Sequence, residues 1–135
     1  MKSRVLEKLK FRRLRATYAI VQFAPEADVP HWVRGDEFTS ITRTHEELSI
    51  VCRTDHLPDA AQSPHRWVCL KLEGPFPFSQ TGVLLSFIEP LSVNAIPIFA
   101  ISTYDTDYVL IQEEFIARAM DLLVHAGHEF LSKEV

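Results

Sequence analysis

The stretch that decides the fold is IFAISTYDTDYVLI, residues 98–111. It reads as two apolar strand segments, one around Phe99 and Ile101 and one over 108–111, separated by a polar elbow over 102–107. Ser and Asp favour such turns because their side chains bond to nearby backbone groups. Two carboxylates two residues apart, beside hydroxyls and a Tyr ring, also suit a small cationic group such as an ammonium. The elbow is therefore either an internally satisfied hairpin turn or part of a binding site.

Length and composition indicate one ordinary domain, or two very small ones that share a core. The 135 residues are 47% hydrophobic and 24% charged, as in a globular protein. No apolar run reaches the length of a membrane span, and the first residues lack the apolar segment of a secretory signal. We therefore expect a cytoplasmic protein with no membrane partner. Cys52 and Cys69 form no Cys-x-x-Cys pair, which favours free buried thiols.

Charge is unevenly distributed along the chain. The first fifteen residues hold seven of the 14 Lys and Arg, with Glu7 alone against them, so this basic arm carries +6 and the remainder −10. A basic arm can bind nucleic acid or an acidic membrane. Apolar residues such as Leu9, Phe11 and Leu14 interrupt the charges, however, and we expect a solvated edge element and no nucleic-acid partner.

Local patterns predict strands and loops along the rest of the chain. β-branched and aromatic residues predict strands at 17–23, 38–42, 47–52, 66–72 and 128–131. The two strands within 38–52 form a hairpin. The Gly- and Pro-rich segment 73–80 cannot be a regular helix.

Two amphipathic helices are also predicted. The first covers 82–95, where Leu84, Phe87, Ile88, Leu91 and Ala95 recur at helical spacing on one face. Pro90 should kink or shorten it. The second covers 113–126 and stops at Gly127.

The order of elements from Arg66 onward is strand, helix, strand, strand, helix, strand. This is the ferredoxin-like arrangement, an α+β fold with a four-stranded antiparallel sheet and both helices on one face. Ser40 and Thr44 repeat the spacing of Ser102 and Thr106 at an offset of 62 residues, each pair in a polar elbow before an apolar strand. We therefore expect two tandem βαββαβ-type units, a degenerate one over 1–65 and a complete one over 66–135.

Two parts of the chain resemble a known family. FTSITRT at 38–44 with LSIV at 48–51 resembles the first half of small bacterial tandem ACT-domain proteins. EGP at 73–75, TGVL at 81–84 and IFAISTYDTDY at 98–108 resemble their second half, and also the ACT domains of aspartate kinases and of the CASTOR arginine sensors. The resemblance covers roughly 17–131. It implies a ferredoxin-like regulatory module that binds a free amino acid at an interface between domains and assembles side by side.

Residue by residue, the resemblance implies a ligand site between a helix entry and the elbow. The implied ligand-binding residues are Gln80, Thr81, Gly82 and Leu84 at the helix entry, Thr103, Tyr104, Thr106 and Asp107 in the elbow, and Ser40 and Ile41 in the first copy. Backbone N–H groups at the start of a helix suit a carboxylate, and Asp107 suits an ammonium. The arginine sensors have an acidic residue where this chain has Gln80, so the amino acid stays unnamed.

The sequence gives less support to a metal site or to catalysis. The six His residues are scattered, and Gly127 separates the one pair at ligand spacing, His125 and His128, so we expect no metal and no cofactor. Cys52 lies in an apolar strand without a catalytic motif, and we expect no enzyme activity. The main alternative is a ligand-free oligomerisation or protein-interaction module, because short sheets with an open edge pair readily across subunits. The expected assembly is a homodimer.

Overall fold

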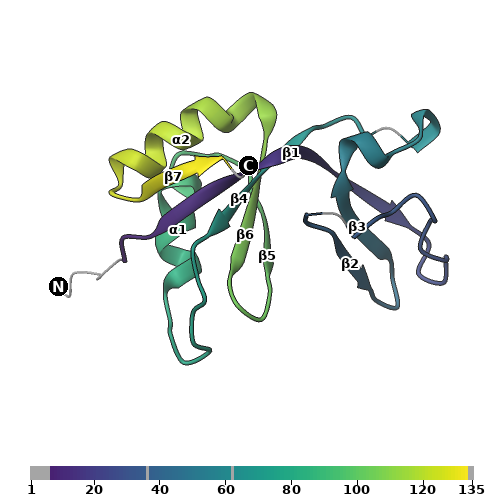
Figure 1. Cartoon of the computed structure of the whole chain (residues 1–135), viewed down its shortest axis with the longest axis horizontal. Helices are drawn as coiled ribbons and strands as arrows, with labels where there is room; N and C mark the ends of the chain where they lie inside the picture. The colour runs from purple at the N-terminus through teal and green to yellow at the C-terminus, as the bar shows by residue number, and fades with distance from the viewer. Residues whose placement is uncertain (1–6, 36, 62, 134–135) are drawn as a thin grey trace. The chain divides into compact units, whose positions relative to one another are not determined.

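The computed structural model describes residues 7–35, 37–61 and 63–133, which form two compact units (Figure 1). The larger unit comprises 7–15 and 68–133, and the smaller unit comprises the described part of 16–67. Strand β1, Lys10–Phe23, contributes its first part to the larger unit and the rest to the smaller. Lys2 and Arg4 of the basic arm lie outside the described residues.

The larger unit is built on a five-stranded sheet in the order β7-β1-β4-β6-β5. Besides β1, its strands are β4 (Trp67–Leu72), β5 (Phe99–Ser102), β6 (Asp107–Gln112) and β7 (Glu129–Lys133). Strands β5 and β6 pair antiparallel, whereas β7 pairs parallel to β1. The prediction of a four-stranded antiparallel sheet beginning at Arg66 was therefore wrong, because the start of β1 inserts between β4 and β7.

The basic arm is a core element of this unit, and the prediction of a solvated edge element was wrong. Phe11 is fully buried, with its ring 5.2 Å from that of Phe87 and 5.4 Å from that of Phe130. Two of the basic side chains that alternate with apolar residues in this segment have partners within the larger unit. Lys8 Nζ donates to the carbonyl of Ala126 at 2.7 Å, and Arg12 Nε pairs with Glu73 at 3.2 Å.

Both helices pack on one face of the sheet (Figure 1). Helix α1 runs over Val83–Ser92, and helix α2 runs over Ile116–His125 after a 3-10 turn at Glu113–Phe115. Alternate residues of a strand face the same side, so one face of β4 and β6 meets the helices. The core between them contains Phe87, Leu91, Ala119, Leu123, Val68, Leu70, Leu72, Val109 and Ile111. These contacts confirm the two amphipathic helices, except that Ala95 lies beyond the end of α1 and is exposed.

One buried imidazole joins three parts of the larger unit. Pro90 lies inside α1 and has no N–H, so the carbonyl of Ser86 loses its helical donor. His128 Nε2 donates to that carbonyl at 2.9 Å, and His128 Nδ1 accepts the N–H of Leu9 at 3.1 Å. The His128 residue is 4% exposed. It therefore ties the residues that precede β1 to α1 and to the turn before β7.

The segment between β4 and α1 lies directly against the elbow over 102–107. The N–H of Phe76 donates to the carbonyl of Asp105 at 2.8 Å. Thr106 is buried, and its hydroxyl donates to the carbonyl of Leu72 at 2.8 Å. These two bonds hold the elbow against the end of β4.

The smaller unit is a three-stranded antiparallel sheet in the order β2-β3-β1. Strand β2 covers Ser40–Arg43 and β3 covers Leu48–Arg53, with Ile41 opposite Ile50 and Ile20 opposite Val51. The predicted hairpin is confirmed. In the described part of this unit the helical segments are two 3-10 turns, Thr54–His56 and Asp59–Ala61.

Across the described residues, no helix has both the length and the apolar character that crossing a membrane requires.

Gly74→Ala should loosen the contact between the β4–α1 segment and the elbow. A Cβ at Gly74 would lie 2.9 Å from the carbonyl oxygen of Asp105 and 3.1 Å from Cβ of Thr106, so the backbone must shift. We expect the free energy of unfolding, measured in urea, to fall by about 1–3 kcal/mol. Gly35→Ala is the control, because nothing lies within 4 Å of its added Cβ. Equal stability of the two variants would contradict the close packing.

The stability of the protein should fall as the pH drops below about 6.5. Burial lowers the pKa of His128, the hydrogen bond to the Ser86 carbonyl acts in the opposite direction, and the charge of Lys8 lowers it further. As the pH falls, the unfolded chain therefore takes up the imidazole proton before the folded protein does. The neutral, buried His128 therefore stabilises the fold fully above the unfolded-state pKa. This stabilisation is lost as the pH falls from that value towards the lower pKa of the folded state.

Urea unfolding as a function of pH measures this loss. His128→Gln should show a flatter decline at acidic pH than His125→Gln, whose imidazole is exposed on α2. The same slope in both variants would show that His128 does not cause the decline.

Candidate functional site

The elbow between β5 and β6 is a tight turn closed by its own polar groups. The N–H and the hydroxyl of Thr103 both donate to the carbonyl of Thr106, at 2.8 and 3.1 Å. Ser102 and Asp107 are cross-strand partners, and the Ser102 hydroxyl donates to Oδ1 of Asp107. The second carboxylate oxygen, Oδ2 of Asp107, has no hydrogen bond to the described residues. The elbow is thus an internally bonded turn that still presents an acceptor.

A second wall comes from the segment before α1. The side-chain amide of Gln80 donates to both carboxylate oxygens of Glu7, at 3.0 and 2.9 Å. The N–H of Glu7 in turn donates to the hydroxyl of Ser86 on α1, at 3.0 Å. The orientation of Gln80 is therefore set by residues 73 positions away in the sequence. Sequence patterns could not reveal Glu7 as its partner, because no local spacing links them.

These two walls border an open cavity of about 190 Å³ on the larger unit. Five of the predicted site residues line it: Gln80, Thr103, Tyr104, Thr106 and Asp107. The elbow residues Ser102 and Asp105 also contribute, as do Phe76, Pro77 and Phe78, which sequence reasoning missed. The missed residues belong to the Gly- and Pro-rich segment, whose loop character was predicted but whose contact with the elbow was not.

The other five predicted residues lie outside this lining. Gly82 is the N-cap residue before α1, with φ +78°, and as a glycine it has no side chain to cap the first turn. Thr81 and Leu84 flank it without lining the cavity. Ser40 and Ile41 belong to β2 of the smaller unit. Their part in a site stays a prediction.

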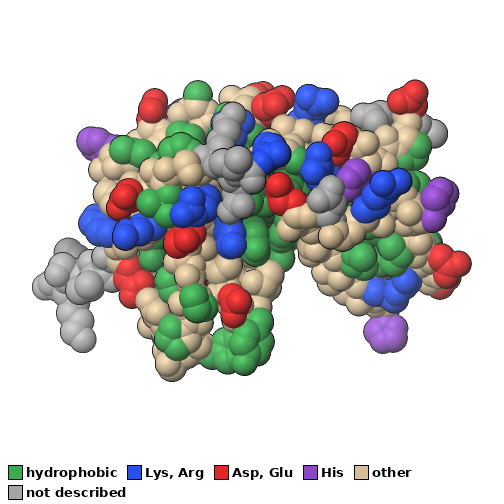
Figure 2. Space-filling model, viewed as in Figure 1, with side chains coloured by type: hydrophobic (Ala, Val, Ile, Leu, Met, Phe, Trp, Pro, Cys, Tyr) green, Lys and Arg blue, Asp and Glu red, His purple; other side chains and the backbone are tan. Residues whose placement is uncertain are grey.

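The cavity is acidic on its polar side. Asp105 and Asp107 line it, Glu7 stands behind Gln80, and its described lining contains no Lys, Arg or His. Figure 2 shows hydrophobic and acidic side chains next to each other at the tip of the β5–β6 hairpin. Such a surface suits a ligand with a positively charged end and an apolar part.

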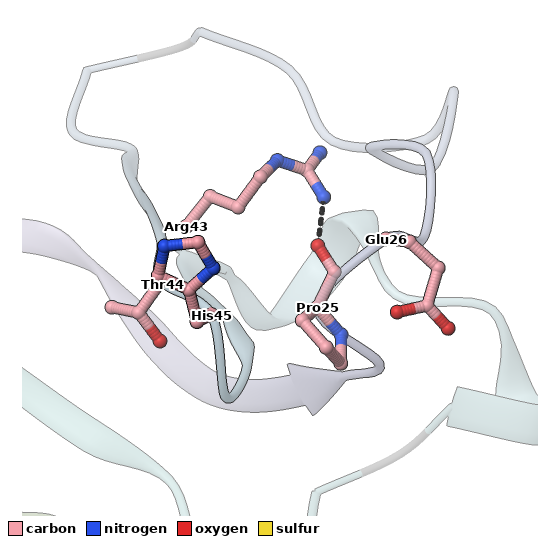
Figure 3. A pocket seen from close by; sticks show the side chains of 5 residues that line it. All are labelled: Pro25, Glu26, Arg43, Thr44 and His45. Carbon is pink, nitrogen blue, oxygen red and sulfur yellow. Dashed lines mark hydrogen bonds between the residues drawn. The ribbon is translucent and has the colours of Figure 1, made fainter.

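A wider cavity, of about 450 Å³, lies on the smaller unit (Figure 3). Its lining comprises Pro25, Glu26, Arg43, Thr44 and His45. The Arg43 guanidinium reaches across it to donate to the carbonyl of Pro25, and the Thr44 hydroxyl accepts the N–H groups of Glu46 and Glu47. Apart from Pro25 the lining residues are exposed, and the Arg43 guanidinium and the Thr44 hydroxyl already make hydrogen bonds within the unit. This cavity therefore offers a ligand less enclosure than its volume indicates.

Comparison with known proteins agrees with this architecture. A family model described as an ACT domain matches residues 62–124, and a model of an N-terminal domain matches 16–60. A crystal structure of an Agrobacterium tumefaciens protein is 41% identical, covers 96% of each chain and has a TM-score of 0.87. A Vibrio cholerae protein of unknown function shares the fold, at 17% identity over 93% of this chain and 92% of its own, with a TM-score of 0.70. Residues 62–124 therefore match an ACT domain, and the chain as a whole is similar to the Agrobacterium tumefaciens protein.

Proposed function

We propose that the protein is a regulatory module that binds a free amino acid in the cavity between Gln80 and the elbow. One observation carries this proposal. Five residues that the sequence assigned to a ligand site, from two separate segments, line one cavity on the larger unit. ACT domains are regulatory modules that bind small ligands, which supports a binding role over a catalytic one.

The elbow would hold the ammonium group of the ligand. Oδ2 of Asp107 is an acceptor beside the cavity, and the hydrogen bond from Ser102 to Oδ1 fixes the plane of the carboxylate. An ammonium-to-carboxylate hydrogen bond is about twice as strong as a neutral one. The hydroxyl of Thr103 and the phenol of Tyr104 stand on the same wall. Thr106 contributes by holding the elbow in place through Leu72.

The start of α1 would hold the carboxylate. Its first N–H groups lack helical acceptors, and no side chain caps them from Gly82. The helix dipole adds partial positive charge at this end. Thr81, Gly82 and Leu84 do not line the cavity, so the carboxylate would have to extend past Gln80 to reach their backbone N–H groups. A side chain at Gly82 would obstruct that approach and would also strain its positive φ.

The smaller unit would complete the tandem arrangement. We propose that the smaller unit corresponds to a degenerate ACT-like unit and the larger unit to a complete one, with a homodimer as the assembly. The three-stranded sheet of the smaller unit keeps the hairpin that carries Ser40 and Ile41. We propose Ser40 and Ile41 as the ligand-binding residues of this unit, through a hydroxyl and backbone groups.

Asp107→Asn should weaken binding of the amino acid by at least about tenfold while the fold is kept. The substitution preserves an oxygen that can accept the Ser102 hydrogen bond, but it removes the charge that faces the ammonium. Thermal-shift screening of the twenty amino acids followed by calorimetry on the responders measures this effect. Asp121→Asn is the matched control, because Asp121 is exposed on α2. No response to any amino acid would count against the proposal.

A ligand-free assembly module is the second candidate, and exposed aromatic residues favour it. Phe78 is 75% exposed and Tyr104 is 79% exposed at the elbow, next to β5 at the edge of the sheet. Large exposed apolar groups mark interaction sites. Light scattering separates the two candidates: Thr103→Val should abolish the ligand response and leave the oligomeric state unchanged. Loss of the oligomer without any ligand response would favour the assembly module.

A further inference from the structure

A second cavity opens beside the first, on the outer side of the elbow. Its volume is about 310 Å³, and it is lined by two prolines, three aromatic residues and one carboxylate: Pro75, Phe76, Pro77, Phe78, Tyr104 and Asp105. Five of these residues also line the smaller polar cavity. The two cavities are therefore adjoining parts of one depression, polar toward Asp107 and Thr103 and apolar toward Pro75.

The aromatic wall of this depression is ordered but uncovered. The rings of Phe78 and Tyr104 are 4.7 Å apart in an edge-to-face arrangement, although each residue is at least three-quarters exposed. Two large rings at such exposure form an apolar surface that a ligand can contact. Because the two rings lie beside the polar cavity, a ligand bound in that cavity could cover them.

We propose that the second cavity is the side-chain subsite for the amino acid whose charged ends occupy the first, and that it selects a large apolar side chain such as that of Met, Leu or Phe. This inference rests on the proposed function, because it requires the zwitterion to lie between Gln80 and Asp107. The side chain then leaves Cα toward Phe78 and Tyr104 and lies against the prolines. Two cavities of these volumes together accommodate an amino acid of this size.

The charge of the cavity lining also affects which amino-acid side chains the outer cavity accepts. Asp105 lies on the boundary of both cavities and Asp107 lines the inner one, whereas the described lining of both contains no Lys, Arg or His. A ligand carboxylate in the outer cavity would face Asp105, and Lys71 lines only an adjoining cavity, so repulsion and desolvation disfavour glutamate and aspartate. Apolar side chains meet no such penalty.

The outer wall of the subsite is attached to the elbow. The N–H of Phe76 donates to the carbonyl of Asp105, and Gly74 leaves the space for this approach. Because the subsite does not need to form on binding, little ordering is required when a side chain enters it.

Calorimetry with the full chain tests the inference on the series glycine, alanine, norvaline, methionine, phenylalanine and glutamate. Each methylene fully buried against the rings should tighten binding by up to about fourfold. We expect methionine to bind at least about tenfold tighter than alanine, and glutamate to bind more weakly than alanine. Phe78→Ala should weaken methionine binding several-fold more than alanine binding, because Phe78 lines both cavities and the larger side chain covers more of its ring. Val124→Ala, at another exposed apolar residue, should leave the ratio unchanged.

The outcomes separate the inference from the proposed function. If no amino acid binds, both fail. If amino acids bind but glycine or alanine binds as tightly as methionine, or glutamate binds tightest, the side-chain subsite is wrong and the proposed function stands. If Phe78→Ala weakens every ligand equally, the ring belongs to the zwitterion site and the subsite is again overturned. Circular dichroism of Phe78→Ala checks that the variant is folded.

Discussion

The site depends on the close attachment of the β5–β6 elbow to the end of β4. A hydroxyl from Thr106 and a backbone N–H from Phe76 make the two bonds, and Gly74 leaves the space in which the chains approach. An exposed hairpin tip would otherwise be mobile, since few buried contacts restrain it. With these bonds in place, the carboxylates of Asp105 and Asp107 and the aromatic wall keep a fixed relation to one another. The unit can therefore offer a preformed cavity even though most of its lining is near the surface.

A second constraint connects the basic arm to the same site. Pro90 leaves the carbonyl of Ser86 without its helical donor, and the His128 imidazole supplies one while accepting the N–H of Leu9. Burying an unpaired carbonyl would cost about 1–3 kcal/mol, so this imidazole offsets the presence of a proline inside α1. The chain that precedes Leu9 is thereby held along α1, where Glu7 meets Gln80. The arm thus contributes to the cavity by orienting Gln80.

The parts of the fold that could be predicted are those encoded locally. Helical spacing located α1 and α2, and turn chemistry located the elbow, because those signals lie within a dozen residues. The strand at Lys10–Arg15 was missed because alternating basic and apolar residues look the same on a solvated edge as on a strand inserted between distant partners. The residues of the site divide in the same way, into those that local sequence indicates and those that only tertiary contacts bring together. Asp107 and Thr103 could be named from their own segment and a family resemblance, whereas Glu7 and Phe78 became visible only once tertiary contacts placed them.

The central claim is that a zwitterion lies between Gln80 and the elbow. The most direct measurement is a titration of the isotope-labelled protein with its tightest-binding amino acid, followed by two-dimensional 1H–15N NMR. The account predicts saturable shifts concentrated in the backbone amides of 102–107, in those at the start of α1 and in the side-chain amide of Gln80. Saturable shifts confined to the hairpin tip around Arg43 and His45, with the elbow unchanged, would contradict it.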